Sequence, residues 1–177
     1  MRILGIATFD DMLQNAAMIA SINVSVPVVA DADTGYGGSL NVANTVRQYA
    51  RAGIAGLHIE DQAPEKRCGH LSGKLLVSRE LFATRLRAAC EARHETGSEI
   101  VIIVRIDACA GVDPGGNTGF DEAIGRLQMA VESDVDALFF EAPQSEQQCA
   151  AVVSEFPDVP ILINMVQGGS DLCIQRA

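Results

Sequence analysis

The sequence lacks the features that mark three classes of protein. No stretch approaches the ~20 apolar residues that a membrane-spanning helix needs, so we expect no membrane partner. Basic residues are scarce, with 13 Lys and Arg against 23 Asp and Glu and a formal net charge of −10, which argues against a nucleic-acid partner. The cysteines are odd in number and contain no CxxC pair, so neither a disulfide framework nor a zinc knuckle is indicated. We therefore expect a protein of a reducing compartment, the cytoplasm.

What the sequence does contain is a βα alternation. Short β-branched runs alternate with helical patterns at intervals of roughly thirty residues or a little more, the spacing of βα units. The runs span 27–30, 56–60, 100–105, 136–141 and 160–164, and helical patterns cover 9–20, 39–53, 78–97, 121–132 and 145–155. Predicted N-caps are Thr8, Ser39, Ser78 and Ser145. The glycine-rich segment 107–119 is predicted as a loop.

The predicted strands are apolar on both faces, which favours a parallel sheet covered by helices. Either a β/α barrel or an open doubly wound sheet satisfies this pattern, and periodicity alone does not choose between them. A length of 177 residues with 48% in the hydrophobic set predicts one domain with a substantial core. The fold class is therefore α/β.

Polar side chains stand at the carboxyl end of each predicted strand. In chain order they are Asp31 and Asp33, Glu60 and Asp61, Arg105 and Asp107, Glu141, and Asn164. Because the carboxyl ends of parallel strands converge on one face of an α/β sheet or barrel, we expect these side chains to form a site.

The charged members of this set indicate metal and carboxylate binding. Asp31 and Asp33 project to the same side if the backbone between them stays extended, and with Glu60 they offer oxygen ligands for Mg²⁺ or Mn²⁺. The alternative is that one aspartate caps the turn before the TGYGG segment. Arg105 is suited to bind a carboxylate through two hydrogen bonds, and an ion pair with Glu60 or Glu141 is compatible with that role.

The segment EKRCGH, residues 65–70, places a thiol among charged groups in a predicted loop over the same strand ends. Lys66 and Arg67 would lower the pKa of Cys68, so this thiol is a candidate nucleophile or proton donor, and His70 could share its proton. The alternative is a surface thiol in a basic turn. His58 lies inside a strand, and we interpret it as a core or site-edge histidine rather than a ligand.

Several of these motifs together resemble a known superfamily. VVADADTGYGG, AGLHIEDQ, KRCGHLSGK and the strand end at Arg105, in this order and spacing, closely resemble the isocitrate lyase and phosphoenolpyruvate mutase superfamily. The resemblance runs from about Leu4 to Gly169, and KRCGH after EDQ is a specific signature. CGHLSGK is most similar to the group that contains oxaloacetate acetylhydrolase and dimethylmalate lyase, and less similar to methylisocitrate lyase.

The resemblance implies a fold, a cofactor and residue roles. The fold would be a (β/α)8 TIM-type barrel in a protein that oligomerises, with a magnesium ion held by Asp31, Asp33 and Glu60. Arg105 would take part in catalysis and bind the 2-oxo-acid or oxalate end of the substrate. Cys68, assisted by His70, would protonate the enolate-like carboxylate that is released when the bond breaks. The remaining substrate-binding residues would be Glu141, Asn164 and Gly69.

The chain also departs from the superfamily pattern. Two strands that carry a serine–glycine turn and a further aspartate precede the matching residues in the family, and Ile3 stands where that aspartate would align. The tail after Gly169 breaks from the pattern as well. We therefore expect residues 1–177 to form a single incomplete barrel domain with about five of the eight strands.

The predicted function is Mg-dependent cleavage of a carbon–carbon bond in a small 2-oxo or 2-hydroxy dicarboxylate. The reaction would be of the oxaloacetate hydrolase or of the 2-methylisocitrate/dimethylmalate lyase type. The alternative is a catalytically inactive truncated homologue that acts as a binding or assembly partner of a full-length relative, or an incomplete gene model. A homo-oligomer is expected.

Overall fold

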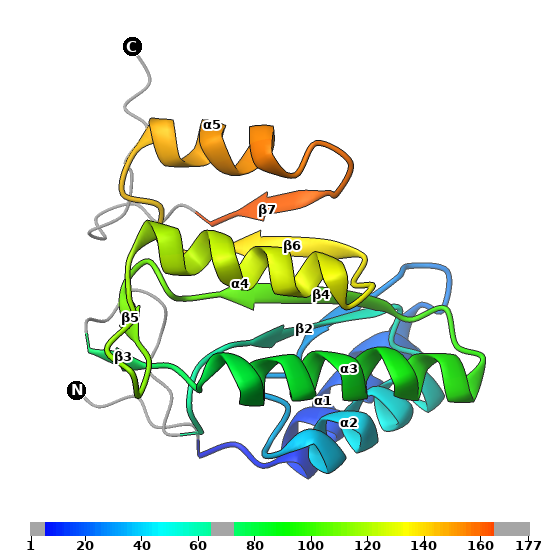
Figure 1. Cartoon of the computed structure of the whole chain (residues 1–177). Helices are drawn as coiled ribbons and strands as arrows, with labels where there is room; N and C mark the ends of the chain where they lie inside the picture. The colour runs from blue at the N-terminus through cyan, green and yellow to red at the C-terminus, as the bar shows by residue number, and fades with distance from the viewer. Residues whose placement is uncertain (1–5, 65–72, 165–177) are drawn as a thin grey trace.

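A five-stranded parallel sheet forms the centre of the computed structural model, which describes residues 6–64 and 73–164. Its strands are β1 (Val29–Asp31), β2 (Gly56–Glu60), β4 (Val101–Ile106), β6 (Ala137–Phe140) and β7 (Ile161–Ile163), in the order β1-β2-β4-β6-β7. All four neighbouring pairs are parallel. The arrowheads of β4, β6 and β7 point the same way in Figure 1, so the carboxyl ends of the strands lie together. The predicted α/β fold with a five-stranded parallel sheet is confirmed.

Helices alternate with these strands and cover the sheet. They are α1 (Phe9–Ile22), α2 (Ser39–Arg51), α3 (Arg79–Thr96), α4 (Phe120–Glu132) and α5 (Glu146–Glu155), and α3 and α4 lie in front of the strands in Figure 1. In the three central strands β2, β4 and β6, the residues that face the helices are completely buried in the core, for example Leu57, Ile59, Ile102, Val104 and Leu138. Burying one such side chain stabilises the fold by about 1.5–3 kcal/mol. This is the layering of part of a β/α barrel, in which the helices lie outside the strands.

No helix of the described residues is both long and apolar enough to cross a membrane.

Three of the four predicted N-caps are confirmed. Thr8 forms a capping box with α1, Ser78 accepts a hydrogen bond from the backbone of α3, and Ser145 does the same in α5. The prediction for Ser39 is wrong, because the N-cap of α2 is Gly38 and Ser39 is the first helical residue. Gly38 has no side chain that could accept a hydrogen bond, so this helix begins without a side-chain cap.

A second, two-stranded sheet lies at the carboxyl ends of the main strands. It pairs β3 (Lys74–Leu75) with β5 (Gly111–Val112) in parallel, and both strands lie beside the strand ends in Figure 1. The sequence predicted a loop over 107–119, and the strand was missed because it is only two residues long. Gly111 is required there, since a Cβ at that position would lie 2.5 Å from Cδ2 of Leu76. The pairing brings Lys74 to the strand ends.

Candidate active site

The pairing register of the sheet brings polar residues into two adjacent rows. Glu60 is aligned with Arg105, and Arg105 with Phe139, while Asp31 is aligned with His58. These residues alternate with the completely buried residues that face the helices, so they occupy the opposite face of the sheet. The strands therefore assemble Asp31, His58, Glu60, Arg105 and Phe139 at their carboxyl ends, and we call this group with Asp107 and Glu141 the strand-end site.

Arg105 is the centre of the strand-end site. Its Nε donates to Oδ2 of Asp107 at 2.8 Å and its Nη2 donates to Oδ1 of the same carboxylate at 3.0 Å. Nε also lies 3.6 Å from Oε2 of Glu60, and Nη2 lies 3.7 Å from Oε1 of Glu141. The guanidinium carbon stands 5.2 Å from the ring centroid of Phe139. The predicted ion pairs with Glu60 and Glu141 are confirmed, whereas the two-bond partner, Asp107, was not anticipated.

The contacts of Arg105 limit how it can bind a substrate. Since Asp107 occupies the Nε–Nη2 edge, an incoming carboxylate has the Nη1–Nη2 end of the guanidinium to bind. Burial lowers the pKa of Arg105, but the hydrogen bond and charge of Asp107, together with Glu60 and Glu141, outweigh it and raise the pKa. Arg105 therefore stays positively charged, and its bonds to Asp107 hold the Nη1–Nη2 end in one orientation.

Asp107 is fixed from a second side by Lys74. The Nζ atom of Lys74 donates to Oδ1 of Asp107 at 2.7 Å, and both side chains are completely buried. Burial raises the pKa of Asp107, but the hydrogen bonds and charges of Arg105 and Lys74 outweigh it, so the pKa is lowered. The carboxylate thus stays ionised and holds both cations in place.

Beneath this pair lies another buried ionic group. Oδ1 of Asp61 accepts from the backbone N–H of Asp107 at 2.9 Å, and Oδ2 accepts from Nη1 of Arg126 at 3.4 Å. Arg126 also donates to Oε1 of Glu122 at 2.7 Å. Burial and the charge of Asp107 raise the pKa of Asp61 to about 7, against the opposing effect of Arg126. Sequence reasoning missed Lys74 and Arg126, whose contacts join residues 33 and 65 positions apart and leave no local pattern.

The two aspartates after β1 do not follow an extended backbone. Asp33 has a φ of 51°, in the left-handed region, and its N–H donates to Oδ1 of Asp31 at 2.7 Å. The alternative that an aspartate caps the turn before TGYGG is thus confirmed for Asp31. Asp33 instead lines a cavity of about 380 Å³, together with Phe9, Thr34, Tyr36 and Pro64 among others. The condition for both carboxylates to project to the same side is not met.

The strand-end site nevertheless has the donor chemistry and charge that suit a divalent cation. Asp31 and Glu60 in this site supply carboxylate oxygens, the donors that Mg²⁺ and Mn²⁺ prefer, and Asp33 lies next to them, since its backbone oxygen accepts the N–H of Glu60 at 2.9 Å. Burial, followed by the charge of Asp107, raises the pKa of Glu60 to about 8 although Arg105 opposes it, so a bound cation would favour the ionised form of this carboxyl group. Within residues 6–64 and 73–164, no three His, Cys, Asp or Glu side chains are arranged to hold a metal. The three-residue metal site stays a prediction.

His58 lies at the edge of the strand-end site, as interpreted from the sequence. Its Nδ1 is 3.5 Å from Oδ1 of Asp31, and its ring packs edge-on against Phe139 with 5.7 Å between centroids. Burial lowers the pKa of His58 and outweighs the raising effect of Asp31, with Arg105 lowering it further. These surroundings therefore disfavour the positively charged imidazole.

The remaining predicted residues fall into two groups. Asn164 donates from Nδ2 to Oε2 of Glu141 at 3.1 Å, so these two substrate-binding candidates contact each other beside Arg105. Cys68, Gly69 and His70 lie outside the described residues, and their roles stay predictions.

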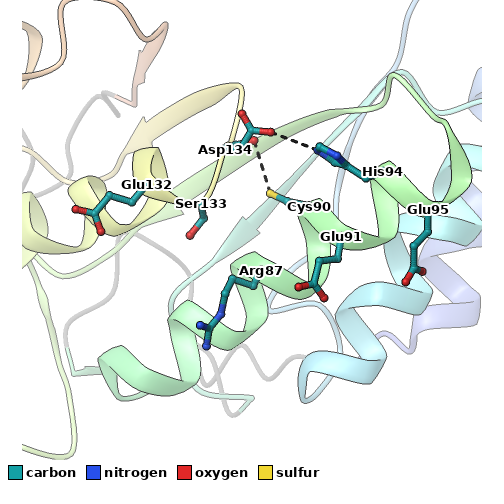
Figure 2. A pocket seen from close by; sticks show the side chains of 8 residues that line it. All are labelled: Arg87, Cys90, Glu91, His94, Glu95, Glu132, Ser133 and Asp134. Carbon is teal, nitrogen blue, oxygen red and sulfur yellow. Dashed lines mark hydrogen bonds and ion pairs between the residues drawn. The ribbon is translucent and has the colours of Figure 1, made fainter.

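A separate hollow lies away from the strand ends, between α3 and the end of α4 (Figure 2). Its volume is about 420 Å³. Cys90 donates to the backbone oxygen of Asp134 at 3.7 Å, and Nε2 of His94 lies 3.3 Å from Oδ2 of Asp134. Burial raises the pKa of Cys90 to about 11, so its thiol stays protonated. None of the predicted site residues lines this hollow, which leaves the strand-end site as the candidate active site.

Comparison with protein families matches residues 5–175 to the phosphoenolpyruvate phosphomutase family. The chain belongs to this family. Solved structures of the phosphoenolpyruvate mutase/isocitrate lyase superfamily, among them 2,3-dimethylmalate lyase, share its fold, so the resemblance stated from the motifs is confirmed.

Three similar proteins illustrate the relationship. The 2-methylisocitrate lyase of Escherichia coli (strain K12) is 43% identical over 171 residues, which cover 94% of this chain and 53% of the relative. The crystal structure of 2,3-dimethylmalate lyase is 45% identical with a TM-score of 0.89, covering 97% of this chain and 55% of that one. Oxaloacetate acetylhydrolase bound to 3,3-difluorooxalacetate is 42% identical with a TM-score of 0.89, covering 97% and 56%.

The chain thus spans about half the length of the curated relatives it matches. A further family structure, phosphonopyruvate hydrolase in complex with oxalate and Mg²⁺, is 30% identical with a TM-score of 0.72 and covers 90% of this chain and 53% of that one. The identities to the methylisocitrate, dimethylmalate and oxaloacetate enzymes are close to one another, so they do not separate these three groups.

Proposed function

We propose that this family member cleaves a carbon–carbon bond in a small 2-oxo or 2-hydroxy dicarboxylate, with Mg²⁺ or Mn²⁺ as cofactor. Oxaloacetate, 2-methylisocitrate and 2,3-dimethylmalate represent the substrate class, in line with the names of the similar proteins. The observation that carries the proposal is Arg105, a buried cation whose orientation is fixed by two hydrogen bonds to Asp107 beside a group of carboxylates.

Each part of the strand-end site has a separate task in this proposal. The Nη1–Nη2 end of Arg105 binds the carboxylate of the substrate, and Glu141 with Asn164 shapes the pocket beside it. Asp31, Asp33 and Glu60 are the residues that would hold the cation. When bound, the cation supplies positive charge that stabilises the oxygen atoms next to the breaking bond. Phe139 covers one face of the guanidinium and keeps water away from it.

The proton transfer is assigned to the segment that contains Cys68. By resemblance to the superfamily, the thiol of Cys68 gives its proton to the enolate-like carboxylate as the bond breaks, and His70 assists. Lys66 and Arg67 precede this thiol and would lower its pKa. A positioned general acid contributes about 10²–10⁴-fold to a rate.

Turnover measurements test the proposal directly. The purified chain is incubated with Mg²⁺ and each of oxaloacetate, 2-methylisocitrate and 2,3-dimethylmalate, and cleavage products are followed by NMR. We expect cleavage of one substrate that is abolished by a chelator and by Arg105→Met. The matched control is Arg47→Met, because Arg47 forms a surface ion pair with Glu95. Cleavage that survives both the chelator and Arg105→Met would refute the proposal.

A second candidate function is that of a binding or assembly partner. Within the described part of the chain, β1 and β7 each pair with one strand only, and exposed strand edges favour association with other chains. Size-exclusion chromatography with light scattering, with and without a full-length relative, tests this candidate. Mn²⁺ binding without turnover, together with a stable complex, is the result that favours it.

The free state of Cys90, Cys109 and Cys149 supports a cytoplasmic location.

A further inference from the structure

One oxygen of Asp31 is engaged by the protein itself. Oδ1 accepts the N–H of Asp33 at 2.7 Å, and the backbone oxygen of the same residue accepts the hydroxyl of Tyr49 at 3.1 Å. Since Tyr49 is completely buried, the backbone at the end of β1 is anchored to α2. The backbone of Asp31 is therefore held in place, and Oδ1 of its carboxylate faces the backbone N–H of Asp33.

His58 stands on the neighbouring strand with one ring nitrogen aimed at the same oxygen. Asp31 is the register partner of His58, and Nδ1 of His58 lies 3.5 Å from Oδ1 of Asp31. This nitrogen is buried from solvent and makes no hydrogen bond within the described residues. The edge-on packing against Phe139 fixes the plane of the ring. A buried nitrogen that is held 3.5 Å from a carboxylate needs an explanation, because leaving it without a partner is costly.

The charge of the carboxylate decides which ring nitrogen carries the proton. A lone pair on Nδ1 would face a negatively charged oxygen and be repelled, whereas an N–H at Nδ1 would be attracted and needs only a small side-chain movement to form a hydrogen bond. We infer that His58 is a positioning residue, which donates from Nδ1 to Oδ1 of Asp31 and so presents Oδ2 of Asp31 to a divalent cation.

This inference rests on the proposed function, since it assigns His58 a task in the metal site of that proposal. It explains why a polar ring stands inside a strand next to an aspartate whose Oδ1 already accepts a backbone hydrogen bond. Groups that orient a metal-ligating side chain typically change metal affinity by about 10–100-fold when they are removed.

The first measurement reads the tautomer of His58 and needs neither metal nor activity. Long-range ¹H–¹⁵N NMR spectra of the chain labelled at histidine distinguish Nδ1–H from Nε2–H rings, and loss of one signal set in His58→Asn assigns the residue. We expect the neutral Nδ1–H form. An Nε2–H ring at His58 overturns the inference whether or not the chain binds a metal.

The second measurement follows Mn²⁺ affinity by electron paramagnetic resonance. His58→Leu should weaken binding by about 10–100-fold. His58→Asn should bind like the parent, because its amide nitrogen stands close to where Nδ1 was and can donate to Asp31. His94→Leu is the matched control, since His94 is a largely exposed histidine far from the site.

The outcomes separate this inference from the proposed function. Equal Mn²⁺ affinities for His58→Leu and His94→Leu, with a parent that binds Mn²⁺, overturn the inference alone. If the unsubstituted chain binds no Mn²⁺, the metal site of the proposed function is overturned. The inference that His58 presents Oδ2 of Asp31 to a cation is then overturned as well. Rescue by His58→Asn but not by His58→Leu is a result that a purely structural role would not produce.

Discussion

Lys74→Met should destabilise the fold strongly, although sequence reasoning assigned no role to Lys74, the last residue of the KRCGHLSGK motif. Its ammonium group is completely buried and donates to Asp107 at 2.7 Å. Removing one partner of a buried ion pair costs about 3–5 kcal/mol, because the other charge stays buried without its partner. Asp107 retains two hydrogen bonds from Arg105, so the lower end of this range, about 3 kcal/mol, is expected. Methionine has a similar length and flexibility, so the loss of packing is small.

Urea unfolding followed by circular dichroism measures this loss. If the same variant is unfolded by heat instead, a loss of about 3 kcal/mol corresponds, for a chain of this size, to a fall of about 6–12 °C in Tm. Arg47→Met is the matched control, because Arg47 pairs with Glu95 at the surface, where ion pairs contribute about 0–1 kcal/mol. If Lys74→Met unfolds at the same urea concentration as Arg47→Met, the reasoning that the buried charges stabilise this site is wrong.

Burial raises the pKa of Glu122, but hydrogen bonds from Arg79 and Arg126 outweigh burial and lower this pKa overall. The ionised form of Glu122 therefore stabilises the fold at any pH above the pKa of the unfolded state. This stabilisation is lost as the pH falls through the lower pKa of the folded state. Glu122→Gln should cost about 1.5–3 kcal/mol at neutral pH, and urea unfolding should show the difference from the parent shrinking below about pH 4. Gly35→Ala should lower the Tm more than Gly53→Ala, because both have positive φ but only at Gly35 would a Cβ meet Val42, at 2.4 Å from Cγ2; equal losses would contradict this. In a chain extended to the length of its relatives, Cys68→Ser should fold and bind oxalate like the parent yet lose about 10²–10⁴-fold in turnover, and full activity would show that Cys68 is only a surface thiol.

Much of the fold could be predicted because its signals are local. Strands were found from β-branched runs, helices from apolar periodicity, and helix starts from side chains such as Thr8 and Ser78 that bond the adjacent backbone. The gathering of Glu60, Arg105 and Glu141 also followed from local information, because parallel strands bring their carboxyl ends together.

The errors occur where a distant partner or a glycine decides the structure. Lys74 and Arg126 contribute to the site through contacts across 33 and 65 positions, which no window of sequence displays. The left-handed φ of Asp33 depends on the turn that Asp31 caps, so the expectation of an extended backbone could not anticipate it. The sequence correctly placed His58 at the edge of the site. That its Nδ1 points at Asp31 could not be predicted, because this depends on which residues the neighbouring strands align.

Oxalate binding measured by titration calorimetry, with and without Mg²⁺, tests most directly whether the strand-end site recognises a 2-oxo-acid-like carboxylate through Arg105 and a cation. Oxalate should bind when Mg²⁺ is present and not when it is absent. Arg105→Met should weaken this binding by about 10–150-fold, the loss expected for hydrogen bonds to a charged group. Oxalate that binds equally well without Mg²⁺, or equally well to Arg105→Met, would contradict the account.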